Sequence, residues 1–207
     1  MARYPGGFDH PELQAIAKKH KMASLVEFTQ KAFSKKAFRD TGQICDDMVK
    51  VVSRSSMVSM FEKPKFRDFV KRLSLNEKQF LADALKKILH GKQQAGLEAM
   101  VDLLLTEKLA KWSLVTIIPA YYAPTEEVFV KPTTAKAIIQ QLELSSLEYK
   151  PRPSWSFYDA YRTVVNEAKQ QVNESFSTSN AAFTGFLMMS FTAVSYTHLT
   201  LPTIREV

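Results

Sequence analysis

The chain has 207 residues, of which 45% are hydrophobic and 24% are charged, and its formal net charge is +7. This composition is that of an ordinary globular domain, so it excludes a largely disordered chain. Cys45 is the one cysteine of the sequence, which excludes an internal disulfide and a cysteine-based zinc site; we expect it to be a small buried residue. The start lacks the apolar stretch of a signal peptide, and no apolar run approaches the roughly 20 residues that span a bilayer. We therefore expect a soluble, cytoplasmic protein with no cofactor, no metal and no membrane contact.

Apolar residues recur at helical spacing in several stretches of the first half of the chain. These stretches are residues 11–22, 24–38, 44–61, 65–73 and 97–109. Asp40-Thr41-Gly42 interrupts the pattern and is expected to cap the helix that follows. The clearest helix is predicted over residues 75–90, because Ser74 and Glu77 have the spacing of a capping box and Gly91 follows as a stop signal.

The second half has a more mixed pattern. Residues 112–123 are rich in β-branched and aromatic residues, and Pro119 is expected to kink or end a helix there. Helices are predicted over residues 135–142, capped by Thr133 or Thr134, and from Ser154 to about Phe176. Two proline-flanked stretches, residues 126–131 and 147–152, are expected to be extended. We predict a mainly α, bundle-like single domain over residues 1–193, with at most one short extended pair.

The last residues of the chain do not read as evolved protein. Residues 194–203 are VSYTHLTLPT, which resembles the translation of an adapter used in transposase-based sequencing libraries, codon for codon. The codons of Ala193 and Ile204 are compatible with the same adapter. An apolar run over residues 183–191 stops directly before this string. We therefore exclude residues 194–207 from the fold prediction and expect the natural domain to be incomplete at its C-terminal end.

Four short motifs follow one another along the chain. They are YPGGF at residues 4–8, MFEK at 60–63, VFVKPTTAK at 128–136 and YKPRPSW at 149–155. On these motifs the chain resembles a family of uncharacterised bacterial proteins, over almost all of residues 1–193. The resemblance implies a cytoplasmic single domain, and it implies no activity.

Positive charge is concentrated in the first half of the chain. Residues 1–110 hold 20 Lys and Arg against 13 Asp and Glu, whereas residues 111–193 hold seven of each. A basic half can attract nucleic acid or another polyanion, because phosphate contacts depend mainly on Lys and Arg. The candidate contacts there are Lys63, Lys65, Arg67, Lys71 and Arg72. Together with the helix after Ser74 they could form a helix-turn-helix, although interleaved carboxylates are also typical of an ordinary solvated face.

Two further segments carry candidate contacts. Lys131 and Lys136 flank a predicted helix start, where free amides and the helix dipole favour anions. Arg152 and Trp155 flank a rigid Pro-X-Pro turn, where they could stack on a base or a peptide. Capping, core packing and surface ion pairing are the structural alternatives for these two segments.

The sequence gives little indication of catalysis. The histidines at positions 10, 20 and 90 lack metal-ligand spacing, and no nucleophile motif or convergent carboxylate pair is present. We therefore predict a non-enzymatic binding or regulatory protein that contacts nucleic acid. The alternative is a protein–protein interaction module or accessory subunit with an acidic protein partner, and an enzyme with an unrecognised site is the third hypothesis.

Overall fold

The computed structural model describes residues 9–19, 21–173, 175 and 178–198, and α-helices dominate this part of the chain. This confirms the predicted mainly α fold. In chain order the elements are α1 (Pro11–Lys19), α2 (Met22–Ala32), the short 3-10 helix η2 (Ala37–Arg39), α3 (Thr41–Arg54), α4 (Glu62–Arg72), α5 (Leu75–His90), α6 (Gln93–Leu105), α7 (Trp112–Tyr122), α8 (Pro132–Gln141), α9 (Trp155–Gln170) and α10 (Asn180–His198).

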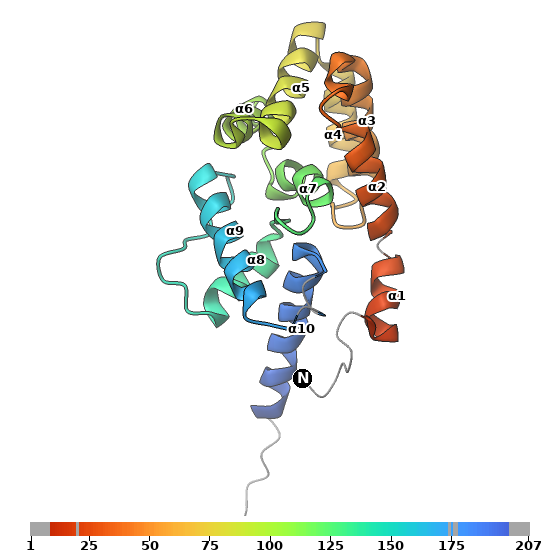
Figure 1. Ribbon diagram of the computed structural model, residues 1–207. Coiled ribbons are helices and arrows are strands. Elements are labelled where there is room, and N and C mark those ends of the chain that lie inside the picture. Colours follow the sequence, from red (N-terminus) through yellow and green to blue (C-terminus); the bar gives the residue numbers. More distant parts are fainter. Residues whose placement is uncertain (1–8, 20, 174, 176–177, 199–207) are drawn as a thin grey trace, which may run out of the picture.

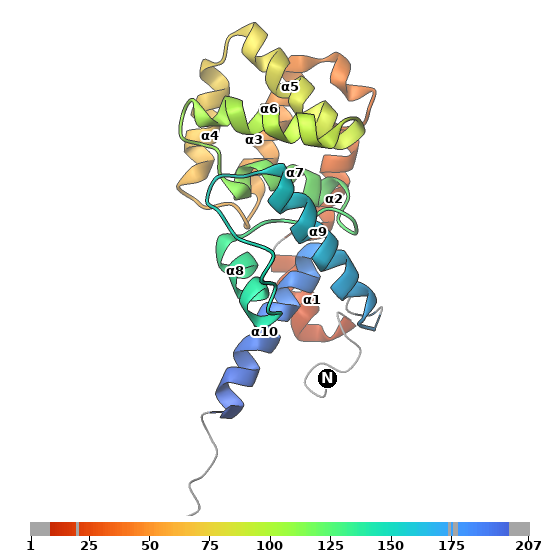
Figure 2. The same ribbon diagram turned by 90° about the vertical axis from the view of Figure 1, so that its left-hand side faces the viewer.

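The helices form two groups that meet at α7. Figure 1 and Figure 2 both show α3–α6 at one end of the molecule and α8–α10 at the other, with α7 between them. In the first group α5 packs closely on α6, and α3 packs on α4 and α5; in the second, α10 packs on α8 and α9. Buried apolar side chains of both groups belong to one core cluster.

Helix α7 occupies the centre of this core. Nearly all of its residues are buried, which is typical of a helix that is hydrophobic on every side. Its β-branched residues and Pro119 therefore lie within a continuous helix, and Pro119 does not end it. The burial of side chains such as Ile117 and Tyr121 outweighs the low helix propensity of this segment.

The predicted extended pair does not form. Residues 127–131 and 147–153 are not helical, but the described part of the chain contains no strand. These segments bind helix side chains instead. The Val130 N–H donates to Thr116 Oγ1 at 3.0 Å, and the Trp112 indole N–H donates to the Lys150 carbonyl at 2.8 Å. Side chains of α7 thus take the backbone hydrogen bonds that a strand pair would have used.

The predicted N-terminal caps of α3 and α5 are confirmed, and the one predicted for α8 is wrong. The capping box of Ser74 and Glu77 is formed, and Asp40 Oδ1 accepts the Gln43 N–H at 2.9 Å at the start of α3. Neither threonine caps α8, because Pro132 takes the first helical position and Lys131 is the N-cap residue.

Several predicted boundaries also shift. Helix α3 ends at Arg54 where the prediction continued to residue 61, and α9 ends at Gln170 where it continued to 176. Helix α2 ends at Ala32, and η2 replaces the end of its predicted range. Helix α6 starts at Gln93, four residues before the predicted start, and it lacks a side-chain cap that the sequence could have revealed.

The apolar run of residues 183–191 lies in α10, whose backbone remains helical from Asn180 to His198. The helix thus continues across Val194, the first residue of the adapter-like string, and residues 199–203 of that string lie outside the described residues. Within the described part of the chain, no helix combines the length and apolar character needed to cross a bilayer.

Candidate functional site

The cations predicted on α4 lie on the outer side of that helix. Phe66, Phe69 and Val70 are buried in the core, and α4 packs mainly on α3. The opposite side exposes four of the predicted cations, and a fifth, Lys63, is half-buried. The four exposed cations are Lys65, Arg67, Lys71 and Arg72. Because the apolar stripe fixes the rotation of α4, the charges must face away from the core.

Carboxylates neutralise part of this surface. Arg67 Nε donates to Asp68 Oδ1 at 2.9 Å, and this hydrogen bond holds the pKa of Asp68 below its ordinary value. Arg72 Nη2 donates to Glu107 Oε2 at 3.1 Å. By contrast, among the described residues Lys65 and Lys71 form no ion pair.

The tertiary structure adds two lysines that the sequence analysis did not assign to this surface. The connection between α6 and α7 lies beside α4. Glu107 in this connection pairs with Arg72, and Ser113, the second residue of α7, donates through Oγ to Glu62 Oε2 at 2.6 Å. Figure 2 shows this connection and α4 at the same edge of the molecule. The exposed Lys108 and Lys111 lie between these two contacts in the sequence. We define the α4 basic surface as Lys63, Lys65, Arg67, Lys71, Arg72, Lys108 and Lys111.

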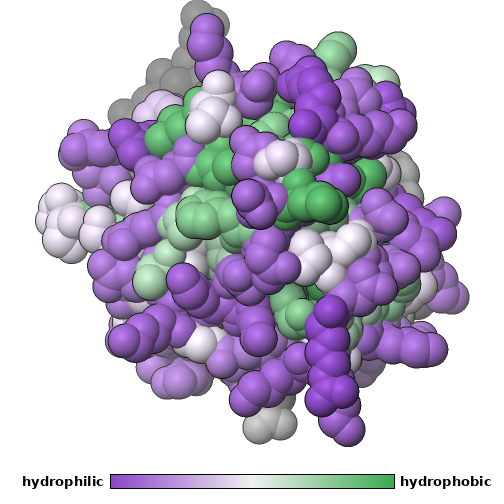
Figure 3. Space-filling model, turned by 90° about the horizontal axis from the view of Figure 1, so that it is seen from above, coloured by the Kyte–Doolittle hydropathy of each residue, from purple (hydrophilic) through white to green (hydrophobic). Residues whose placement is uncertain are grey.

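Exposed apolar side chains lie next to these cations. Met60 and Phe61, directly before α4, are each 74% exposed. Phe61 is the N-cap residue of α4 and Lys65 follows four residues later, so an exposed ring and an exposed ammonium group both lie at the start of this helix. Further along, Leu75 and Phe80 on α5 are 84% and 48% exposed. Figure 3, which views the end formed by α3–α6, shows apolar side chains among a largely hydrophilic surface.

The arrangement of α4 and α5 is not that of a helix-turn-helix. In that motif the two helices pack against each other, and the second presents its outer face to the DNA groove. Here α4 packs on α3, whereas α5 packs mainly on α6, and α4 and α5 make few contacts with each other. The short turn at Ser74 therefore joins two helices that have different partners.

The remaining predicted contacts lie elsewhere and do not join the α4 basic surface. Lys136 Nζ lies 5.2 Å from the ring centroid of Tyr149, a cation–π contact. Arg152 Nη2 lies 3.4 Å from Asp102 Oδ1 in an exposed ion pair. Lys131 lies at the rim of a cavity beside α10, and Trp155 begins α9. The three segments named from the sequence thus lie in at least three places of the fold.

Trp155 belongs to a polar cluster that the sequence analysis missed. Its centre is Arg162, whose guanidinium carbon lies 5.5 Å from the Trp155 ring centroid. Arg162 donates to Glu127 Oε1 at 2.9 Å, to Gln93 Oε1 at 2.7 Å and to Asp159 Oδ1 at 2.6 Å. Because Glu127 and Gln93 come from other elements, spacing within α9 gives no sign of their convergence; only the pair of Asp159 and Arg162, three residues apart, was visible.

The cluster is largely buried. Arg162 and Glu127 have 19% and 13% of their side-chain surface exposed, and the buried Tyr158 hydroxyl donates to Glu127 Oε2. Burial, and then the negative charge of Glu127, raises the pKa of Tyr158 well above its usual value. Burial alone would lower the pKa of Arg162, but attraction by Glu127 and the other partners raises it. The tyrosine is therefore a neutral donor and the arginine a fixed cation near neutral pH.

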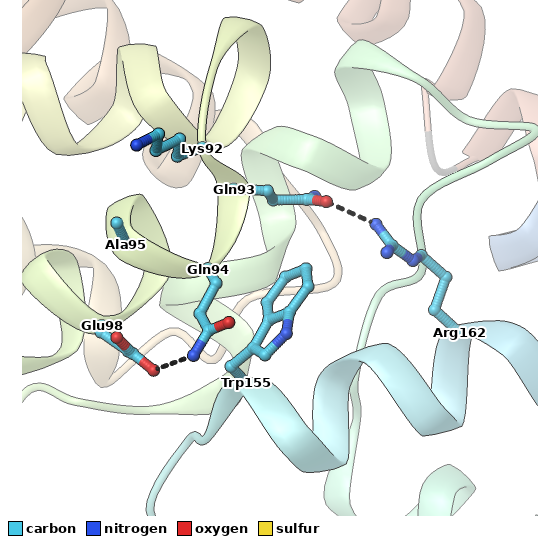
Figure 4. A pocket seen from close by; sticks show the side chains of 7 residues that line it. All are labelled: Lys92, Gln93, Gln94, Ala95, Glu98, Trp155 and Arg162. Carbon is cyan, nitrogen blue, oxygen red and sulfur yellow. Dashed lines mark hydrogen bonds between the residues drawn. The ribbon is translucent and has the colours of Figure 1, made fainter.

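Figure 4 shows the shallow hollow that this cluster borders, with a volume of about 600 Å³. Gln93 accepts a hydrogen bond from Arg162 on one side of the hollow, and Gln94 donates to Glu98 on the other side. The Trp155 ring lies between Gln94 and Arg162. Both terminal nitrogens of Arg162, Nη1 and Nη2, already donate to carboxylate and amide oxygens of the chain. The cluster is therefore better suited to joining α6 and α9 than to binding an anion.

The thiol of Cys45 and the imidazole of His90 are packed or hydrogen-bonded within the fold. Cys45 is buried, as predicted, and burial raises the pKa of its thiol to about 11, so it is protonated near neutral pH. His90 is half-buried, and its Nε2 lies 2.8 Å from the Phe33 carbonyl oxygen. No group of three or more His, Cys, Asp or Glu residues in the described part of the chain could hold a metal ion.

We find no match to the chain among family models, curated proteins or solved structures. The family resemblance inferred from its motifs therefore stays a prediction.

Proposed function

We propose that this protein is a non-enzymatic, cytoplasmic binding protein whose α4 basic surface contacts single-stranded nucleic acid. The observation that carries the proposal is the exposure of both Phe61 and Lys65 at the start of a helix whose outer side bears further cations. Cations that follow the phosphate backbone, combined with an aromatic ring on which a base can stack, are the features used to bind single strands without sequence preference.

The charge state of the surface supports this assignment. Lys65 and Lys71 form no ion pair with a carboxylate of the described residues, so their ammonium groups can bind phosphate without first breaking one. Lys108 and Lys111 extend the positive charge beyond the helix. The side chain of Phe61 supports no core packing, because 74% of it is exposed.

Fluorescence anisotropy with a labelled single-stranded DNA, measured over a salt series, tests the proposal. We expect the logarithm of the binding constant to fall linearly with the logarithm of salt concentration, by about 0.7 for each phosphate contact. The double variant Lys65→Gln/Lys71→Gln should lower this slope by about 1.4. Phe61→Ala should weaken binding by roughly fivefold or more without changing the slope, because stacking on a base contributes about 1–3 kcal/mol.

The matched control is Lys35→Gln/Lys36→Gln. These lysines are also exposed, but they lie in the connection between α2 and η2, outside the α4 basic surface. The control removes the same net charge and should leave the slope unchanged. Absence of binding even at low salt, or equal effects of the two double variants, would contradict the proposal.

The exposed apolar residues favour one second candidate, a protein–protein interaction module with an acidic partner. Met60, Phe61 and Leu75 are each at least 74% exposed, and exposed apolar groups beside charge are typical of binding surfaces. A photoreactive amino acid in place of Phe61 separates the candidates. Crosslinks to protein that persist after nuclease treatment favour this candidate, and crosslinks to nucleic acid favour the first.

A further inference from the structure

A second site lies on the far side of the molecule from α6, where α1, α8 and α10 meet. A cavity of about 430 Å³ opens there, within the range of small-molecule sites, which is roughly 300–1,000 Å³. Figure 1 and Figure 2 show α8 and α1 on either side of α10. The walls come from these three helices, from the start of α2 and from the residues that follow α3 and precede α8.

The cavity wall is mainly apolar. Leu13, Phe129 and four methionines contribute to it; the methionines are Met22, Met57, Met188 and Met189. Methionine side chains are flexible and polarizable, and they adapt to ligands of different shapes. An apolar cavity of this kind favours an alkyl chain, because burying each methylene group contributes about 0.8 kcal/mol.

One part of the cavity rim is polar and positively charged. Lys131 is the one charged residue among the described residues that line the cavity. Thr133 and Thr134, at the start of α8, also line the cavity and follow Lys131 closely in the chain. No side chain caps this helix, and its first backbone hydrogen bond is from the Ala135 N–H to the Lys131 carbonyl, so the amides of both threonines are left without a partner inside the helix. The rim therefore complements a negative charge.

We propose that this cavity binds a single-chain amphiphile with an anionic head group, of the fatty-acid class. Its alkyl chain would lie among the methionines, and its carboxylate would lie at the rim against Lys131 and the start of α8. This site is independent of the α4 basic surface, so it stands whether or not the protein binds nucleic acid.

Gly185 offers a position at which a side chain can be added to the cavity wall. It lines the cavity from α10 and is exposed, and among the described residues a Cβ atom placed on it would meet no atom of a neighbouring element within 4 Å. A large side chain at this position can therefore extend over the cavity opening without displacing its neighbours. Gly185→Phe is the blocking variant, and Gly185→Ala, which adds a single methyl group, is its matched control. Ala182→Leu, three residues earlier on the same helix, is a second blocking variant.

Isothermal titration calorimetry with dodecanoate, below its critical micelle concentration, tests the proposal on the full chain. We expect one site and a negative heat-capacity change, the sign of apolar burial. Each blocking variant should weaken binding at least about tenfold, the loss expected when two methylene groups are no longer buried. Gly185→Ala should stay within about twofold of the unchanged chain. Circular dichroism melts first establish that each variant is folded.

The head-group assignment has its own test. Lys131→Glu should weaken dodecanoate binding by about fivefold, because it replaces an attractive charge at an exposed rim by a repulsive one. The same variant should bind dodecanol, which has no charge, as well as the unchanged chain does. Three results would overturn the proposal: no binding of dodecanoate, unchanged affinity in both blocking variants when they are folded, or equal effects of Lys131→Glu on both ligands.

Discussion

Arg162 Nη1 lies 2.9 Å from Glu127 Oε1, and this ion pair joins α9 to the connection between α7 and α8. Tyr158 and Gln93 donate to the same carboxylate, so its oxygens are satisfied although little of it reaches solvent. Asn180, which is fully buried, continues the polar network by donating to the Glu127 carbonyl at 3.2 Å and to Asn166 Oδ1 at 2.9 Å. The network thereby joins α9 and α10 to the loop that precedes α8.

We expect Arg162→Met to lower the free energy of unfolding by about 3–5 kcal/mol, because it leaves the Glu127 carboxylate buried without its cation. Arg152→Met is the matched control, since its ion pair with Asp102 is two-thirds exposed on both sides and should contribute no more than about 1 kcal/mol. Urea unfolding followed by circular dichroism measures both. Equal losses in the two variants would contradict the role assigned to Arg162.

The close packing of α5 on α6 depends on Gly96. A Cβ atom at this position would lie 2.6 Å from the Ala84 carbonyl oxygen and 2.6 Å from the Ile88 nitrogen. Both are backbone atoms of α5, so they cannot move aside by changing a rotamer. We expect Gly96→Ala to destabilise the fold by about 1–3 kcal/mol, although alanine is the better helix former. A thermal melt that shows an unchanged or raised Tm would refute this close approach.

Gly185→Ala should have the opposite effect on stability. Among the described residues the added methyl group meets no atom of a neighbouring element within 4 Å, and it restricts the unfolded chain. We expect a gain of about 0.4–1 kcal/mol in the free energy of unfolding, measured under the same urea conditions. The comparison with Gly96→Ala separates helix propensity, which is the same in both, from steric space, which differs. Destabilisation by this variant would show that the position is not open.

Stability should fall in the alkaline range, in part because of Cys45. Its pKa is raised by burial from the ordinary value of 9.0 to about 11, so above pH 9 the unfolded chain releases this proton while the folded chain retains it. Between about pH 7.5 and pH 10 this difference should cost the folded state about 1.4 kcal/mol. The Cys45→Ala variant lacks this thiol but keeps every tyrosine that also titrates in the alkaline range. Its free energy of unfolding should therefore fall by about 1.4 kcal/mol less between the same two pH values. Urea unfolding at the two pH values measures the difference, and parallel losses in both proteins would contradict it.

Local signals predicted the well-patterned helices. The capping box of Ser74 and Glu77, the cap at Asp40 and the apolar stripe of α5 act within a few residues, so they are readable from the sequence. The course of α7 was not predictable in the same way, because its residues favour extended structure locally and become helical where burial on all sides outweighs that preference.

The assignment of residues 194–203 to an adapter also stays a prediction.

The helical class of the protein, the position of its best-capped helices and the outward-facing cations of α4 can be inferred from the order of the amino acids. These properties follow from the periodicity of side chains along a helix and need no partner segment. The folded arrangement is needed to show which distant groups meet: Lys108 and Lys111 beside α4, Glu127 and Gln93 around Arg162, and Lys131 at the rim of an apolar cavity. These long-range contacts depend on how the helices pack in three dimensions, and the spacing of residues along the chain does not predict that packing.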